Sequence, residues 1–421
     1  MKINTGKGSH LNKLLFSTML VTANRFIVTL AAFNASGRKF IPDLLNWDIF
    51  KQAAYTSLTR YDSGWYAQIA QWGYINEKSS AFFPLFPLLM RGFSTLSGLS
   101  FKICGQGISI FCFIIALWLV QILTEQSRTL RLNVNKQKAG RWIACIIAFN
   151  PVSFYFTICY TESLFLMLIL LFMIAISKKK WFLAGVIGFF AGITRNSGVF
   201  LVIIFFMEYF HAVLPEYCGS MLRERIKHYI RAFLIFIWHF RLSYFRVYRS
   251  FLNIMLIPAG TVMYFIYLFF RFGSLSSSFS AVDQFGRSSM APWLTLYRGI
   301  QYNFEKITTT DKTYILNYFL LELIAVAVFL FAVFYLIKRV PLAYDIFMTV
   351  SLVLPLCKPA YLGLVDYFTS FPRYTITLFP YFVALYGIFH KSRKAFIFYL
   401  AASIYMLIRC VSFWSIGKFI A

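Results

Sequence analysis

Acidic residues are scarce in this sequence, in which Asp and Glu together number 15 among 421 residues, against 41 Lys and Arg. Charged residues make up only 13% of the chain and hydrophobic residues 59%, which excludes an ordinary soluble domain. The net charge of +26 does not indicate nucleic-acid binding, because Lys and Arg occur in short runs between apolar segments. Such runs are typical of cytoplasmic loops that fix topology and contact anionic lipid. The composition therefore predicts an all-α polytopic membrane protein.

Several site motifs are also missing. The seven cysteines are scattered without a CxxC or a Cys/His cluster, so we expect no disulfide framework and no structural zinc. The chain has no Walker A motif, no GxGxxG, no HExxH and no DxD pair, and no loop is long enough for a Rossmann-type domain. A soluble nucleotide sugar has no evident site here. If the protein is a transferase, we expect a lipid-linked donor and neither a cofactor nor a metal.

Apolar runs that approach the length of a spanning helix recur along the chain. They lie at 14–34, 103–123, 142–160, 161–177, 181–194, 198–210, 251–271, 314–337, 341–357, 374–389 and 395–413. We therefore predict about eleven transmembrane helices in a single domain over 1–421. The first run follows a basic start and lacks a good cleavage site, which favours a retained signal anchor.

The distribution of Lys and Arg predicts the topology. With the N-terminus in the cytoplasm and 82–97 entering the membrane without crossing it, every large basic cluster falls on the cytoplasmic side. The alternative is that 82–97 forms a short span. In the favoured topology, 35–102 is a first outer loop with short interfacial helices, and 272–312 is a second outer loop. The segment 211–250 is then cytoplasmic, and its basic residues around an apolar centre predict a helix in the headgroup region.

The stretch "RYDSGWYAQIAQWGY" at 60–74 carries an isolated carboxylate, Asp62. Trp65, Ile69 and Trp72 follow at helical spacing, which predicts an amphipathic helix on the membrane surface. Two roles remain open for Asp62. It can cap this helix, as Asp commonly does, or act as a general base. Asn caps as well as Asp but cannot accept the proton, so Asp62→Asn separates the two roles.

Three further charged residues lie at predicted helix ends on the same side. Glu162 either places a favourable charge in the first turn of a helix or is a buried functional group. Arg195 in "GITRNSG" and Arg373 in "SFPRY" either snorkel to the membrane interface or bind a lipid phosphate. An outer position is unusual for Arg under the positive-inside tendency, which favours phosphate binding.

Five motifs in order resemble the PIG-V family, which comprises GPI mannosyltransferase II and its bacterial relatives. They are "RYDSGWYAQIAQWGY", "AFFPLFPLLMR", "FNPVSFYFTICYTESLF", "GITRNSG" and "SFPRY". The resemblance covers most of the chain, although each motif alone is weak. It implies a GT-C type fold with an essential Asp in the first outer loop, a position that Asp62 matches.

The resemblance also implies an activity, namely transfer of mannose from dolichyl- or polyprenyl-phosphate mannose to a lipid-linked glycan, with inversion. A eukaryotic protein would add the second, α-1,6-linked mannose of the GPI precursor in the endoplasmic reticulum. A bacterial one would modify a cell-envelope glycan or glycolipid at the plasma membrane. The runner-up is a lipid or sugar transporter or flippase. In both settings we expect the site on the non-cytosolic face.

The expected site residues follow from these motifs. Asp62 is the candidate catalytic base, and Arg373 and Arg195 are candidate ligands of the donor phosphate. The candidate substrate-binding residues are Tyr61, Trp65, Tyr66, Tyr160, Glu162 and Asn196. The partners we expect are the lipid-linked donor, the lipid-linked acceptor and membrane lipid, without nucleic acid.

Overall fold

The computed structural model describes residues 7–35, 46, 48, 52–126, 135–213, 250–309, 313–337, 339–360 and 367–420. Within this part of the chain, helices are joined by turns, and the β-structure consists of one isolated bridge between Arg287 and Ala360. The predicted all-α fold is confirmed for these residues. The predicted basic interfacial helix within 211–250 falls almost wholly outside them.

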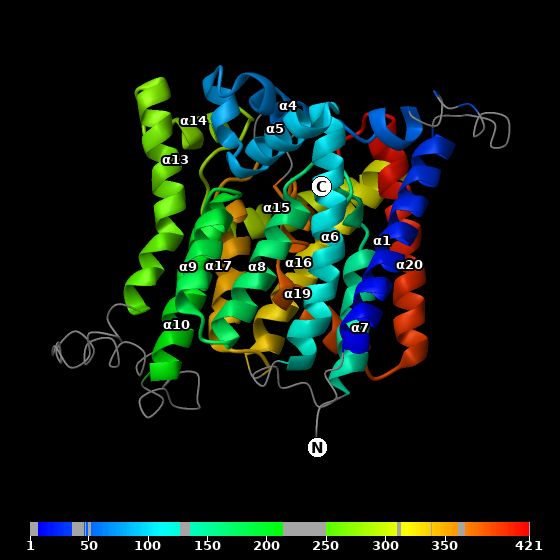
Figure 1. Ribbon diagram of the computed structural model, residues 1–421. Helices are drawn as coiled ribbons and strands as arrows, with labels where there is room; N and C mark the ends of the chain where they lie inside the picture. Colours follow the sequence, from blue (N-terminus) through cyan, green and yellow to red (C-terminus); the bar gives the residue numbers. More distant parts are fainter. Residues whose placement is uncertain are drawn as a thin grey trace.

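Five helices are long and apolar enough to cross a membrane, and most of them run from one end of the bundle to the other in Figure 1. They are α1 (Lys7–Ala35), α6 (Phe101–Gln126), the stretch Ser250–Phe272 that ends with α13 (Leu256–Phe272), α16 (Thr313–Leu336) and α20 (Arg393–Ser415). Five shorter apolar helices accompany them: α8 (Glu162–Ser177), α9 (Trp181–Gly192), α10 (Leu201–Val213), α17 (Leu342–Leu356) and α19 (Phe379–Phe389). The polytopic architecture agrees with the prediction, and the count of about eleven spans stays a prediction.

Short helices gather at one end of the bundle, which we call the α4 end (Figure 1, top). They include α4 (Asp62–Trp72), the 3-10 helix η2 (Glu77–Ala81), α5 (Leu85–Ser97) and α14 (Ser277–Asp283). Because α5 lies beside α4 at this end, 82–97 does not run through the bundle. A π-helix, η1 (Gln52–Thr56), precedes α4, and α15 (Pro292–Thr309) follows α14. The short helices predicted within 35–102 are therefore present.

The predicted span at 142–160 is wrong. The helix α7 covers Lys136–Ala148 and is followed by turns and the 3-10 helix η3 (Ser153–Phe156). Pro151 explains the interruption, because proline lacks the amide hydrogen of a helix interior and disfavours the helical conformation in the residue before it. The irregular segment 149–161 is nevertheless almost entirely buried.

Buried non-helical backbone needs hydrogen-bond partners, and side chains supply them here. The carbonyl of Ala148 accepts from Asn24 Nδ2 at 2.8 Å and that of Thr157 from Arg25 Nη1 at 2.9 Å. The Cys159 and Tyr160 carbonyls accept from hydroxyl groups of α4 and α6, at 3.2 and 2.9 Å. The irregular segment is thereby fixed to three neighbouring helices.

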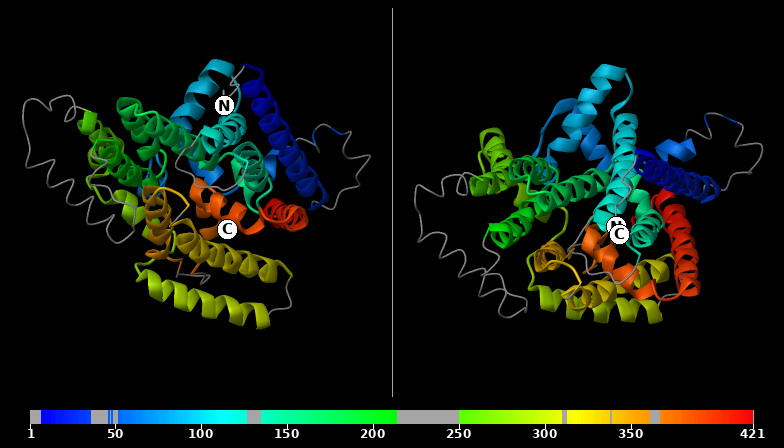
Figure 2. Two further views of the ribbon diagram at one scale, coloured as in Figure 1. Left: turned by 90° about the horizontal axis from the view of Figure 1, so that it is seen from below. Right: turned by 60° about the horizontal axis from the view of Figure 1, so that its bottom comes forward.

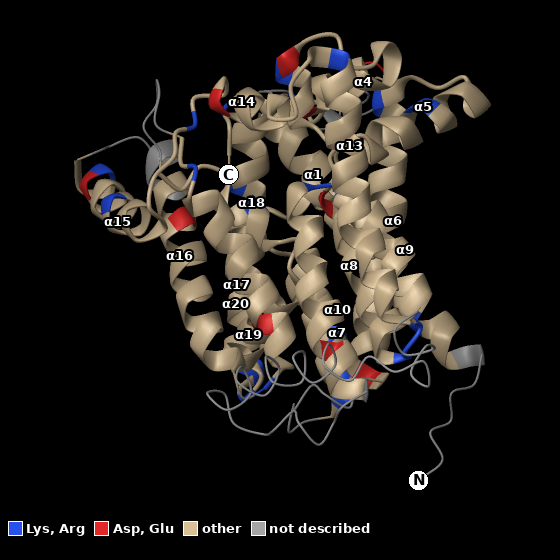
Figure 3. Ribbon diagram, turned by 90° about the vertical axis from the view of Figure 1, so that its left-hand side faces the viewer, with Lys and Arg blue, Asp and Glu red and all other residues tan. Residues whose placement is uncertain are grey.

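Helix packing places the core around α6 and α8, with α7 and α1 against α6 and α9 against α8. In the view from below (Figure 2, left), α1 and α6 lie on the side of the bundle opposite α15 and α16. The approach of α9 to α13 is close, since a Cβ on Gly260 would lie 2.4 Å from the Phe189 carbonyl oxygen. Figure 3 shows charged residues mainly at the two ends of the bundle, which fits a membrane-spanning arrangement.

Candidate active site

Four charged side chains from distant parts of the sequence meet at the α4 end. Arg373 donates from Nη1 to Asp62 Oδ2 at 2.7 Å and from Nε to Glu162 Oε1 at 2.5 Å. Arg195 donates from Nη1 to the same Glu162 oxygen at 2.7 Å. We call Asp62, Glu162, Arg195 and Arg373 the ionic cluster. The sequence predicted all four as site residues, and the structure brings them into one network.

Asp62 is the first residue of α4, but it does not cap the helix. The N-cap position is occupied by Tyr61, and no side chain makes a capping hydrogen bond there. The Asp62 carboxylate instead pairs with Arg373, and its side chain remains 24% exposed. The capping alternative is therefore wrong, and the carboxylate is directed toward the ionic cluster while keeping access to the exterior.

Tyr61 holds the backbone before Asp62 in an unusual conformation. Its φ of 51° lies in the left-handed region, which is unfavourable for a residue with a Cβ. The Tyr61 hydroxyl donates to the Gly417 carbonyl at 2.6 Å, and its ring lies against Trp414. Arg60 also donates to this distant segment, from Nη2 to the Ser415 carbonyl at 2.7 Å. Residues 414–420 thus hold the turn that presents Asp62.

Glu162 lies at the centre of the ionic cluster. Its side chain is fully buried, and both arginines donate to its Oε1 atom. Glu162 is also the first residue of α8, where a negative charge favours the helix dipole. The two roles proposed for this residue are thus compatible. Burial of this carboxylate is tolerated because two guanidinium groups compensate its charge.

The two arginines are buried and paired rather than snorkelling to the interface. Their side chains are 9% exposed in Arg373 and 11% exposed in Arg195. Arg373 lies in the short helix α18 (Phe371–Thr375), with its guanidinium carbon 4.6 Å from the ring centre of Tyr160 and 5.2 Å from that of Tyr155. Burial alone would lower the pKa of Arg373, but the Glu162 and Asp62 carboxylates raise it well above its ordinary value. The guanidinium therefore remains charged.

Arg195 occupies the turn between α9 and the 3-10 helix η4 (Asn196–Phe200). Its Nη1 also donates to Thr161 Oγ1 at 3.1 Å. Gly198 allows this turn, because a Cβ at that position would lie 2.2 Å from the Ala191 carbonyl oxygen. Glycine is therefore required at position 198, because the backbone there passes directly against the end of α9.

The remaining predicted site residues differ in their burial and in their contacts around the ionic cluster. Tyr160 is fully buried, and its hydroxyl accepts from the Asp62 amide at 3.2 Å. Tyr66 is buried, with its hydroxyl 3.5 Å from Thr161 Oγ1. Trp65 is half-buried and stacks on Phe82. Asn196 is exposed and forms no hydrogen bond with the four charged side chains of the described ionic cluster.

The structure also corrects the expected membrane-facing side of α4. Ile69 is buried inside the protein at 5% exposure, whereas Trp72 is 66% exposed. The three residues at helical spacing therefore do not form one lipid-facing stripe. Tyr155 was missed by sequence reasoning, although it lies in one of the five motifs. Its aromatic neighbours there gave no reason to single it out before the contact with Arg373 was known.

The six cysteines in the described ranges are free. Within those ranges, no three His, Cys, Asp or Glu side chains are grouped so that they could hold a metal ion.

Comparison with known proteins gives two related sequences, and no family model matches the chain. The chain is 26% identical over 177 residues to a GPI mannosyltransferase of Caenorhabditis elegans, in a match that covers 36% of this chain and 25% of the relative. It is 26% identical over 211 residues to GPI mannosyltransferase 2 of Schizosaccharomyces pombe, covering 48% and 44%. These matches span less than half the length of either curated relative.

Among solved structures, an oligosaccharyltransferase of Archaeoglobus fulgidus tethered to an acceptor peptide has a TM-score of 0.46 at 14% identity, covering 98% of this chain and 56% of that one. The oligosaccharyltransferase of the same organism in complex with an inhibitory peptide and a dolichol-phosphate has a TM-score of 0.45 at 13% identity, covering 96% and 56%. Both sequence matches are to GPI mannosyltransferases, so this chain is similar in sequence to the proteins that its motifs resemble.

Proposed function

We propose that this protein is a membrane mannosyltransferase that takes mannose from a polyprenyl- or dolichyl-phosphate and transfers it to a lipid-linked glycan. The observation that carries the proposal is the 2.7 Å pairing of a partly exposed carboxylate, Asp62, with a buried arginine, Arg373. This arrangement puts a proton acceptor directly beside a cation suited to phosphate. The similarity to GPI mannosyltransferases supports the sugar and the substrate class.

In the proposed reaction, Asp62 accepts the proton of the acceptor hydroxyl as its oxygen attacks the anomeric carbon of the donor mannose. The new glycosidic bond forms while the bond from the anomeric carbon to the phosphate oxygen breaks. The electron pair of the broken bond leaves with the lipid phosphate. A single displacement of this kind inverts the anomeric configuration. General base catalysis requires the Asp62 oxygen to come within about 2.6–3.2 Å of the acceptor oxygen.

The charges of the ionic cluster suit this reaction. Two carboxylates and two guanidinium groups balance before the reaction. When Asp62 takes up the proton, its negative charge disappears and the cluster gains one net positive charge. The donor phosphodiester simultaneously becomes a phosphate monoester with additional negative charge. The Arg373 guanidinium then stabilises the negative charge on the leaving phosphate. It is already in position to do so, because Glu162 still holds it in place.

Burial divides the predicted substrate-binding residues into two groups. Tyr66, Tyr160 and Glu162 are buried, so we assign them to support of Asp62 and Arg373. Tyr61 and Trp65 retain exposed ring surface and adjoin Asp62 in the sequence, so we assign them to contact with a sugar ring.

Asn196 is exposed beside Arg195, and we place it near the donor headgroup. Arg195, which is held by its ion pair with Glu162, contributes a second positive charge to the proposed phosphate site. Because both arginines are held by one carboxylate, the spacing of the phosphate ligands is set before the donor arrives.

We place the site on the non-cytosolic side of the membrane. Three groups of basic residues lie at the end of the bundle opposite α4, around Lys138, Lys178 and Arg393. They are placed there because α7 and α20 begin at that end and α8 finishes there. Positively charged ends of this kind favour the cytoplasm. In a eukaryotic cell the acceptor would be the GPI precursor in the endoplasmic reticulum, and in a bacterium a cell-envelope glycan or glycolipid.

The test is a transfer assay with purified protein, labelled polyprenyl-phosphate mannose and candidate acceptors. Asp62→Asn should lose product by at least about a hundredfold, the lower range for a general base, while the protein stays folded and retains the donor. Asp283→Asn is the matched control, because Asp283 also lies at the α4 end in an ion pair, with Lys358, but outside the ionic cluster. Unchanged turnover in Asp62→Asn would remove the proposed base.

Transport is the second candidate, since buried charged residues also line translocation paths. A flux assay in proteoliposomes separates the two. Movement of intact donor lipid across the bilayer without sugar transfer would favour a transporter over the enzyme.

A further inference from the structure

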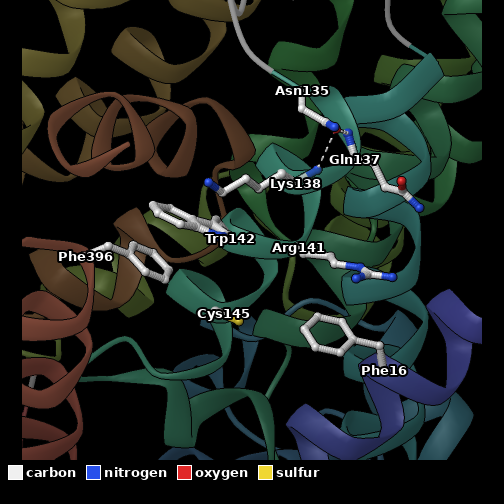
Figure 4. A pocket seen from close by; sticks show the side chains of 8 residues that line it. All are labelled: Phe16, Asn135, Gln137, Lys138, Arg141, Trp142, Cys145 and Phe396. Atoms are coloured by element: carbon white, nitrogen blue, oxygen red, sulfur yellow. Dashed lines mark hydrogen bonds between the residues drawn. The ribbon is translucent and has the colours of Figure 1, made fainter. Parts of the chain in front are cut away.

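A second site candidate lies at the end of the bundle opposite α4. There a cavity of about 370 Å³ opens between α1, α7 and α20. Figure 4 shows Lys138, Arg141 and Trp142 of α7 around this cavity, with Phe16 of α1 and Phe396 of α20 on either side. The ionic cluster does not contribute to it.

The cavity carries uncompensated positive charge. Lys138 and Arg141 are one helical turn apart on α7, and both are exposed. Within the ranges that the structure describes, neither has a carboxylate within ion-pair distance, and Glu125 of the neighbouring α6 is already paired with Lys13. Figure 4 shows the two side chains extending to opposite sides, Lys138 toward Phe396 and Arg141 toward Phe16, so positive charge flanks the cavity and favours an anionic ligand.

Aromatic rings hold these cations at the rim and give the cavity an apolar wall. The Lys138 ammonium lies 4.8 Å from the ring centre of Trp142, and the Arg141 guanidinium carbon 5.7 Å from that of Phe16. Trp142 in turn stacks on Phe396, with ring centres 3.9 Å apart. Cys145 adds to the apolar lining. A small soluble anion would contact only the cationic rim of the cavity. A molecule with a charged headgroup and an apolar body would contact both the cationic rim and the aromatic wall.

We propose that this cavity binds the headgroup of an anionic phospholipid of the surrounding membrane. Lys138 and Arg141 attract the phosphate from the two sides of the cavity, and Gln137 at the rim offers its amide to headgroup hydroxyls. Phe16 and Phe396 pack against the glycerol and the first acyl carbons. The volume is within the range of ordinary small-molecule sites. Since α1, α7 and α20 all meet here, a bound lipid joins three helices that are far apart in the sequence.

The test measures lipid retention by the full chain without reference to enzymatic activity. Purified protein in detergent is titrated with dioleoyl phosphatidylglycerol or dioleoyl phosphatidylcholine and followed by native mass spectrometry. We expect phosphatidylglycerol to bind preferentially, and Lys138→Gln/Arg141→Gln to weaken that binding by about thirtyfold, as two surface cations contribute. Trp142→Ala, which keeps both charges, should also weaken binding.

The matched control is Lys178→Gln/Lys180→Gln, which removes two exposed Lys charges between α8 and α9, at the same end of the bundle but away from the cavity. It should bind phosphatidylglycerol like the wild type. An equal loss in this control would mean non-specific charge attraction and would overturn the proposal. Equal binding of phosphatidylcholine, or displacement of the lipid by millimolar inorganic phosphate, would overturn it as well. Monodisperse size-exclusion profiles confirm that each variant is folded.

Discussion

Glu162 and Asp62 both pair with Arg373, yet the structure predicts a much larger loss of stability when the charge of Glu162 is removed than when that of Asp62 is. Glu162 is fully buried and accepts from two arginines that are themselves nearly buried. Replacing it by Gln would leave the described ionic cluster with two cations and one anion. Breaking a buried ion pair by removing one partner costs about 3–5 kcal/mol. We therefore expect Glu162→Gln to reduce stability by an amount in this range.

Asp62→Asn should cost much less stability. The Asp62 side chain is 24% exposed and accepts a single hydrogen bond from Arg373, which keeps its second bond to Glu162. Partial exposure to water lowers the value of this ion pair to about 1 kcal/mol. Both variants should lose activity, but for different reasons. Asp62→Asn removes the base from a folded protein, whereas Glu162→Gln reduces activity because Arg373 and Arg195 lose their common partner.

Two measurements on the same preparations check this pair. The first is the fraction of monodisperse protein that survives heating in detergent, and the second is mannose transfer at a temperature at which all variants are folded. Asp283→Asn serves as the control in both. If Asp62→Asn lowers the thermal midpoint as much as Glu162→Gln, Asp62 is structural and the reasoning is refuted. A Glu162→Gln variant as stable as the wild type would equally contradict the buried coordination of its carboxylate.

Two further predictions concern the backbone around the ionic cluster. Gly198→Ala should destabilise the protein by at least about 1–3 kcal/mol, because its Cβ would clash with the Ala191 carbonyl oxygen. Gly107→Ala in α6 should be neutral or stabilising in the same heating assay, since a Cβ there meets no atom within 4 Å. Tyr61→Phe loses the hydrogen bond to Gly417, worth about 1 kcal/mol, and should lower turnover more than donor affinity. Because this substitution keeps the ring that we assign to sugar contact, a change in donor affinity alone would contradict a role of the Tyr61 hydroxyl in positioning Asp62.

The identity of the charged residues could be predicted because acidic residues are so few. With 15 acids in the chain, each carboxylate next to an apolar run needed an explanation, and Asp62 and Glu162 were found in this way. Their alternatives could not be decided from spacing, because a helix start and a buried ion pair produce the same local pattern. The two alternatives were distinguished only by the position of Arg373 in the fold. This residue lies 311 residues from Asp62 and 211 from Glu162 in the sequence, yet it pairs with both carboxylates.

Sequence reasoning failed where local periodicity did not reflect packing. Ile69 has the spacing of a lipid-facing residue but packs inside the protein, because α4 lies on the bundle and not on an isolated membrane surface. The run 142–160 is apolar enough to suggest a span, yet Pro151 ends its helical character and neighbouring side chains satisfy its carbonyl groups.

By itself, the sequence determined that this chain is a helical membrane protein and which few charges it carries, because composition and apolar run length are local properties that set the solvent of each segment. Tertiary structure alone decided that Asp62, Glu162, Arg195 and Arg373 share one network and that residues 414–420 hold the turn before Asp62. The physical reason is that ion pairing depends on distances of a few ångströms between segments that sequence separation leaves undefined.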